Sequence, residues 1–488
     1  MELQWNQSNC AYLRHDLWET QNLEQTQEVR LSDGMPDIGR VICAWGQPVL
    51  RSKEWRNDGI TATCGVGAWI LYVPEDGSEP KCVDVWLPFQ AKWNLQESRR
   101  EGTVRVSCFL RGIEARARSS RKMVVRASLA VTAEVLEPTH QTIFTPGELP
   151  ADVQVLEKCY PALLPKEAGE KQFSLEEECV ISGDKPQKIL YCQAYPCVTE
   201  QSVIGSRAVF KGNYAFRLLY MTEAGQIRNY LQNFSYAQYA DLDGDYENDA
   251  GLSVILTVTS LDTDLTENGI YIKCGLVGQY LVSDRSMIQV AEDAYSPYQE
   301  VTPVLDMAQL PMILDRTDHL MTLQEWLPSE AKEVMDAVFF PDQTVQFLEN
   351  GNLVSQAGGQ FQVLYKDMDG NLQSAIEYWS EEWSFPMAET CKAYVRLVGM
   401  CPNEMGDILL QLEAVTVSQQ TIPMISGLSI GNRVQPDPNR PSFILMRAGE
   451  RTLWELAKES GTTVASIQMT NGINGEPEKG RMLLIPIQ

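Results

Sequence analysis

The sequence is poor in the residues and motifs that most often carry enzymatic chemistry. Its 488 residues include only three histidines, at positions 15, 140 and 319, which lie far apart without metal-ligand spacing. It contains no glycine-rich phosphate loop, no G-x-S-x-G elbow and no H-E-x-x-H motif. These absences favour a protein that is not an enzyme and that uses no metal ion and no cofactor.

Cysteine spacing and the lack of long hydrophobic runs exclude further classes. None of the 12 cysteines forms a C-x-x-C pair, so zinc ribbons and thioredoxin-like redox motifs are not expected. No stretch approaches 18 uninterrupted apolar residues, and the N-terminal residues lack a basic start followed by an apolar run. We expect no transmembrane segment, retention in the compartment of synthesis, and mostly buried, reduced cysteines.

Charge is strongly acidic overall but locally basic. The chain has 65 acidic and 40 basic residues, a formal net charge of -25, which disfavours binding to nucleic acid. The segment from Arg99 to Arg126, however, contains nine Lys or Arg residues and only two acidic residues. Two interpretations have equal weight: a solvated strand face, or a docking surface for an acidic partner or neighbouring subunit. The candidate docking residues are Arg105, Arg111, Arg116, Arg118 and Arg126.

One sequence pattern occurs three times. The segments WILYVPEDG, FRLLYMTEAG and FQVLYKDMDG each contain Leu-Tyr, four further residues and then a glycine. The glycines are Gly77, Gly225 and Gly370, and the pattern predicts a strand that enters a tight turn with a glycine at positive φ. In the third copy, the preceding segment LPSEAKEVMDAVFFPDQTV looks helical by itself, but its place in the repeat predicts a turn and a strand.

Alternating hydrophobicity predicts long strands with one buried face. From Val125 to Val135 every second residue is apolar, whereas Arg126, Ser128, Thr132 and Glu134 would point to a wetter face. We therefore predict a mainly β fold with three tandem sandwich-like or barrel-like domains, over residues 1–145, 146–305 and 306–430.

The C-terminal residues predict a different, partly helical module. Residues 431–441 contain three prolines and are typical of a stiff linker. Residues 442–488 then predict a βααβ domain, in which Thr452 and Glu455 form a capping box and Gly461 ends the first helix. Thr463 would cap the second helix, and strands at Ile444–Met446 and Met482–Ile485 would flank the helices.

These motifs resemble two known domain families. The stretches DGMPDI and WILYVPEDGSEP are similar to the SPOCS domain of sporulation proteins, and the second and third copies resemble divergent forms of it. The pieces GERTLW, NGIN and GRMLLIP resemble a LysM domain. The combination resembles the SipL-type spore coat morphogenesis proteins of clostridia. This resemblance implies a non-catalytic adaptor in endospore coat assembly, located in the mother-cell cytoplasm at the forespore surface.

The LysM resemblance also implies a binding groove between two loops. The groove residues are Gly449, Glu450, Arg451, Thr452, Asn471, Ile473 and Asn474. The favoured ligand is a protein, the coat-basement ATPase of the forespore surface. The alternative is a peptidoglycan or spore-cortex glycan that contains N-acetylglucosamine. Trp454 could stack on a sugar, but its position on a short helix favours packing in the core.

Overall fold

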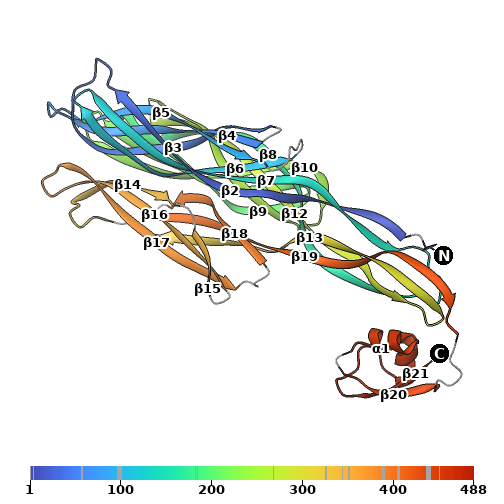
Figure 1. Ribbon diagram of the computed structural model, residues 1–488. Helices are drawn as coiled ribbons and strands as arrows, with labels where there is room; N and C mark the ends of the chain where they lie inside the picture. Colours follow the sequence, from blue (N-terminus) through green and yellow to red (C-terminus); the bar gives the residue numbers. More distant parts are fainter. Residues whose placement is uncertain are drawn as a thin grey trace.

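The chain is mainly β, as predicted. The computed structural model describes residues 2–3, 5–56, 59–95, 102–181, 183, 185–267, 269–324, 327–342, 345–349, 352–386, 391–403, 407–435, 441–449 and 451–487. Within these ranges, antiparallel strands form nearly all of the regular structure, and two short helices lie near the C-terminus (Figure 1). No helix in the described ranges is both long and apolar enough to cross a membrane.

The first part of the chain forms two three-stranded sheets. One sheet has the order β2–β7–β6 and the other the order β3–β4–β5. The strands are β2 (Trp5–Arg30), β3 (Ile38–Arg56), β4 (Gly59–Pro74), β5 (Lys81–Asn94), β6 (Thr103–Ser119) and β7 (Lys122–Pro146). The long first strand, β2, pairs with the last strand, β7. The chain between β2 and β6 forms the second sheet.

The second part repeats this pairing scheme. Its sheets are β11–β12–β8 and β9–β10. The strands are β8 (Gln154–Val180), β9 (Pro186–Thr222), β10 (Ile227–Tyr246), β11 (Gly251–Leu265) and β12 (Gly269–Tyr295). Within β9, Gly205 has a φ of 58°, and Thr199 Oγ1 lies 3.5 Å from Lys211 O. The two halves of β9 therefore lie against each other, as β3 and β4 do.

The third part follows the same scheme with one extra short strand. Its strands are β13 (Gln299–Leu323), β14 (Glu333–Pro341), β15 (Val345–Glu349), β16 (Asn352–Lys366), β17 (Leu372–Pro386), β18 (Cys391–Pro402) and β19 (Ile408–Arg433). Strand β19 pairs with β13 and β18, and also with the N-terminal β1 (Glu2–Leu3). The boundary predicted at residue 305 falls inside β13. The predicted linker, 431–441, begins inside β19, and its residues 436–440 lie outside the described part of the chain.

The three turn glycines have the predicted conformation. Gly77, Gly225 and Gly370 have φ values of 71°, 75° and 84°. This is the left-handed region, which a side chain rarely adopts. The ambiguous segment of the third copy is also a strand, β14, as its place in the repeat predicted.

The three parts share their cores. The largest core cluster includes Val66 of β4, Tyr191 of β9 and Phe340 of β14. Further along, the pairs β2/β7, β8/β12 and β13/β19 extend together toward the end that bears the N-terminus and the C-terminal module (Figure 1). A second cluster there includes Tyr12, Leu164 and Leu310, one from each pair. Since these cores mix residues from all three parts, we expect the parts to unfold together.

The burial of β7 follows the predicted alternation, with one exception. Every second residue from Val125 to Val135 is fully buried. Glu134 was assigned to the wetter face, but it is only 1% exposed, so that assignment was wrong. The cysteines whose side chains the structure describes are free and mostly buried, as predicted, although Cys159 is exposed.

The C-terminal module has the predicted strand–helix–helix–strand order. Its elements are β20 (Phe443–Arg447), α1 (Leu453–Ser460), α2 (Val464–Asn471) and β21 (Met482–Pro486). Thr452 and Glu455 form the predicted capping box, Thr463 caps α2, and Gly461 ends α1 with a φ of 64°. The helices cover the inner face of the sheet, where Leu483 and Ile485 are fully buried.

Candidate functional site

The two predicted groove loops of the module meet at the start of α1. The backbone N–H of Leu453 donates to both carboxylate oxygens of Glu476, at 2.9 and 3.2 Å. Gly449, Arg451 and Thr452 on one loop are exposed, as is Asn474 on the other. Glu450 lies outside the described residues. An intramolecular carboxylate therefore satisfies the first free N–H donor of the helix.

Two of the predicted groove residues hold the module together. Asn471 accepts a hydrogen bond from Leu484 N and donates to Leu484 O, both at 2.8 Å, and it also donates to Ile467 O. Ile473 is 9% exposed and belongs to the core of the module. Asn471 and Ile473 therefore stabilise the module, unlike the exposed residues of the two loops. Their position in the sequence did not reveal this role.

Trp454 packs against the β-rich body. Its ring meets the Tyr295 ring edge-on at 4.8 Å, and its Nε1 donates to Asp293 Oδ2 at 2.9 Å. Lys458, one helical turn later, places Nζ 2.7 Å from both Asp293 oxygens. Tyr295 in turn donates its hydroxyl proton to Thr462 O at 2.9 Å. These contacts, which we call the module latch, fix the module against the end of β12.

Burial alone would raise the pKa of Asp293. The hydrogen bonds from Lys458 and Trp454 outweigh that effect and lower the pKa below its usual value. Asp293 therefore stays ionised at neutral pH, and the latch combines a charge-assisted hydrogen bond with aromatic packing.

The outer face of the module's sheet is apolar and exposed. Leu445 pairs directly with Leu484, so the two side chains lie on the same face, opposite the buried Leu483. The exposed fractions are 52% for Phe443, 63% for Leu445, 51% for Met482 and 39% for Leu484. We call these four residues the outer patch. The strand pair was predicted from the sequence, but its exposed outer face was not.

The candidate basic surface is largely neutralised within the chain. Arg111 pairs with Asp342, Arg116 with Glu114, Arg118 with Glu28, and Arg126 with Glu24. Arg105 is not on the surface at all, since it is only 1% exposed. Its assignment to a docking surface was wrong, because the strand that carries it turns this side chain toward the centre of the molecule.

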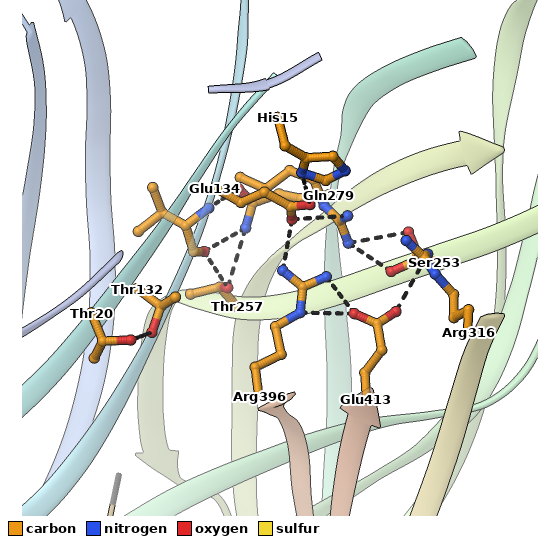
Figure 2. A network of polar contacts seen from close by, with 12 residues as sticks. His15, Thr20, Thr132, Glu134, Ser253, Thr257, Gln279, Arg316, Arg396 and Glu413 are labelled. Atoms are coloured by element: carbon orange, nitrogen blue, oxygen red, sulfur yellow. Dashed lines mark hydrogen bonds and ion pairs between the residues drawn. The ribbon is translucent and has the colours of Figure 1, made fainter. Parts of the chain in front are cut away.

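Arg105 belongs instead to a buried polar network. Its Nη1 lies 3.1 Å from Glu134 Oε2, and Arg396 Nη1 contacts the same oxygen at 2.6 Å. Arg396 also binds Glu413, with Nη2 at 2.5 Å from Oε2, and Arg316 lies 3.4 Å from the other Glu413 oxygen. Figure 2 shows Glu134, Arg316, Arg396 and Glu413 converging from β7, β13, β18 and β19. Arg105 joins them from β6.

The second part of the chain joins the same network. Arg105 Nη2 donates to Ser253 Oγ of β11 at 2.9 Å. Gln279 of β12 (Figure 2) accepts from Val106 N at 2.8 Å and donates to Val106 O at 2.7 Å. Lys53 Nζ also donates to the Gln279 side chain, at 2.7 Å. Polar side chains from all three parts of the chain therefore meet in one place.

The ionisable groups in the network keep one protonation state near neutral pH. Burial alone would raise the pKa of Glu134, but Arg105 and Arg396 outweigh it and lower the pKa to about 2. The same balance, dominated by Arg396 and Arg316, lowers the pKa of Glu413. Burial lowers the pKa of His15, beside Glu134, to about 4. None of these three groups changes protonation near neutral pH, so the arrangement suits structural pairing and not proton transfer.

A small apolar cavity lies beside the junction of the three parts. Its volume is about 70 Å³, and its lining includes Pro48, Pro196 and Pro341, one from each part. Typical ligand pockets are several times larger. No group of three or more metal-ligating side chains lies together among the described residues.

Comparison with known proteins gives no assignment. No family model, no curated protein and no solved structure matches the chain.

Proposed function

We propose that this protein is a non-catalytic adaptor in endospore coat assembly. It acts in the mother-cell cytoplasm at the forespore surface, and its C-terminal module binds a protein of the coat basement layer, an ATPase. The process and the partner come from the resemblance of the repeat and module motifs to SPOCS-type and LysM-type domains. The binding mode comes from the geometry of the module.

The outer patch is the observation that carries this proposal. Residues 442–488 contain five basic and five acidic residues, so the module is neutral while the chain as a whole carries -25. Its outer sheet face presents Phe443, Leu445, Met482 and Leu484 to solvent. Exposed apolar faces of this kind are typical of protein-binding surfaces, because burying them on association is favourable.

The module latch supports the proposal by fixing how the patch is displayed. Trp454 and Lys458 lie on α1, and their contacts with Asp293 and Tyr295 turn the helical side of the module toward the body. The sheet side faces away from it (Figure 1). A surface held in one orientation loses less conformational entropy when it binds than a surface on a free tether.

Glycan binding at the loop groove is the second candidate. The exposed Gly449, Thr452 and Asn474 favour it, since they lie on the two loops that meet at the start of α1. The hydrogen bond from Leu453 N to Glu476 disfavours it, because that donor is already satisfied. Glycan binding would therefore require Glu476 to move away.

One experiment separates the two candidates. Full-length wild type, Leu445→Asp and Val180→Asp are tested for capture by the immobilised coat-basement ATPase and for sedimentation with sacculi. Val180 is a matched control, because it is 61% exposed and pairs with Gly269, whereas the module contacts the opposite end of β12.

Protein binding predicts that wild type and Val180→Asp are captured and Leu445→Asp is not. Sedimentation of wild type with sacculi, without capture by the ATPase, would favour the glycan alternative.

A further inference from the structure

The two edges of the module's sheet are not equivalent. In an antiparallel pair, residues alternate between those whose backbone groups face the partner strand and those whose groups face outward. Ile487 N donates to Ser442 O at 3.0 Å, which places the pair 442/487 among the inward-facing ones. With the register Phe443↔Pro486 and Leu445↔Leu484, the backbone N–H and C=O of Phe443, Leu445 and Arg447 must face the open edge of β20.

The edge of β21 is closed. Leu484 is the outward-facing residue at its centre, and the Asn471 side chain hydrogen-bonds both its N–H and its C=O at 2.8 Å. Pro486, the next outward-facing residue, has no N–H to offer. A neighbouring strand could not pair with this edge without displacing Asn471.

The edge of β20 is open. Among the described residues, none hydrogen-bonds to the backbone of Phe443 or Leu445, and both side chains are more than half exposed. The strand FILMR has four apolar residues, and its only charged residue is the terminal Arg447.

The edge strand β8 is protected, in contrast to β20. β8, which lies at the edge of its sheet, carries a series of charged residues such as Glu170, Lys171 and Glu178. Natural proteins normally protect exposed edges with charges or proline, because an open apolar edge invites pairing with another chain. An unprotected edge is therefore suited to receive a strand.

We propose that the edge of β20 binds its partner by strand addition. An extended segment of a partner protein would pair with Phe443–Arg447 and place apolar side chains against Phe443 and Leu445 and an acidic side chain near Arg447. This inference rests on the proposed function, because it specifies how the module engages its protein partner. Main-chain pairing gives the affinity in this mode, and the alternate side chains give the specificity.

A proline at position 445 tests the main-chain pairing. Leu445→Pro removes an N–H that faces the open edge and leaves the β20–β21 hydrogen bonds intact, so we expect the free protein to tolerate proline at this position. Leu445→Ala shortens the same side chain and keeps the N–H. Full-length variants are compared for affinity to the coat-basement ATPase. Near-ultraviolet circular dichroism of each variant, to which the packed Trp454 and Tyr295 rings contribute, is compared with that of wild type to check folding.

Strand addition predicts a modest loss of affinity for Leu445→Ala. Leu445→Pro should bind at least about tenfold more weakly than Leu445→Ala, since a pairing donor is lost and the ring obstructs the incoming strand. Equal affinities for the two variants would overturn strand addition and leave the proposed function in place. Full capture of Leu445→Asp would instead reject the outer patch, and the proposed function with it.

Amide hydrogen exchange gives a second test on unmodified protein. The peptide containing Phe443–Arg447 should exchange rapidly at its outward-facing amides when free and should become protected on binding of the ATPase. Docking through side chains alone would leave those amides exchanging as before, and this result would contradict the proposal even if the proline variant failed to fold.

Discussion

Arg396 offers the sharpest test of how the three parts of the chain are joined. Its guanidinium is 5% exposed and binds Glu134 at 2.6 Å and Glu413 at 2.5 Å. Arg396→Met keeps much of the side-chain volume and removes the charge. Glu134 would then retain Arg105 at 3.1 Å, and Glu413 would retain Arg316 at 3.4 Å. Both carboxylates would remain buried, and each would have lost one of the two arginines that balance its charge.

The expected loss is about 3–5 kcal/mol of unfolding free energy, the range seen when one partner of a buried ion pair is removed. Urea unfolding followed by fluorescence measures it as a shift of the midpoint. Arg116→Met is the control, because that arginine pairs with Glu114 but is 76% exposed, and it should cost less than about 0.5 kcal/mol. A loss below about 1 kcal/mol for Arg396→Met would refute the reasoning that the network joins the three parts.

The difference in unfolding free energy between wild type and Arg396→Met should change with pH in a definite direction. Glu134 has a folded pKa of about 2, below its usual value, so it contributes stability above pH 4.5 that is lost as pH falls toward 2. In Arg396→Met the pKa of Glu134 is depressed less, so acid removes less stability from the variant. The gap between wild type and variant should therefore narrow below pH 4.5.

Three other predictions concern His15, the module latch and a turn. His15 has a pKa of about 4 in the folded state and 6.5 when unfolded, so the unfolded state binds the proton first as pH falls. Acidification from pH 7 to 5 should therefore lower the unfolding free energy of wild type by about 2 kcal/mol more than that of His15→Gln, as measured by urea midpoints. An equal dependence of stability on pH in the two proteins would contradict this. Asp293→Asn weakens the bond to Lys458 and should speed proteolytic release of the module at neutral pH, while an unchanged rate would mean that the latch contributes nothing. Gly77→Ala should lower the unfolding free energy by about 1–2 kcal/mol, because φ is 71° at this position. Gly34→Ala is the control: a new Cβ would also meet open space there, but φ is not positive, so thermal unfolding should hardly change.

The strands and turns could be predicted from the sequence because their causes are local. Alternation from Val125 to Val135 reports one buried face, and a glycine after Leu-Tyr reports a turn with positive φ. The caps of α1 and α2 are likewise set by residues within a few positions of each helix end. The segment around β14 shows the limit of local propensity, since its repeat position predicted the strand and its composition did not.

The buried network could not be predicted because its partners are distant in the sequence. Glu134 and Arg396 are 262 residues apart, and only the packing of the three parts brings them together. A weak signal was present: Arg396 and Glu413 each lie between apolar neighbours in their strands, and such charges are usually buried only when paired. Arg105 was wrongly predicted to lie on the surface, because it stands in a charged stretch of the sequence and its buried partners could not be predicted.

The module shows the same division between local and distant causes. Its elements follow from caps and spacing, but Asn471 and Ile473 were assigned to a groove because they lie in a loop of the LysM-like pattern. In the structure Asn471 closes the edge of β21, and Ile473 fills the core. The latch joins Lys458 to a residue 165 positions earlier, which no local pattern indicates.

Binding of the full-length protein to the coat-basement ATPase tests the central claim most directly. Wild type and Val180→Asp should bind with equal affinity, and Leu445→Asp should lose at least about 100-fold, since a charge then sits in the apolar contact. Equal affinity for all three proteins, or no binding by wild type, would contradict the account.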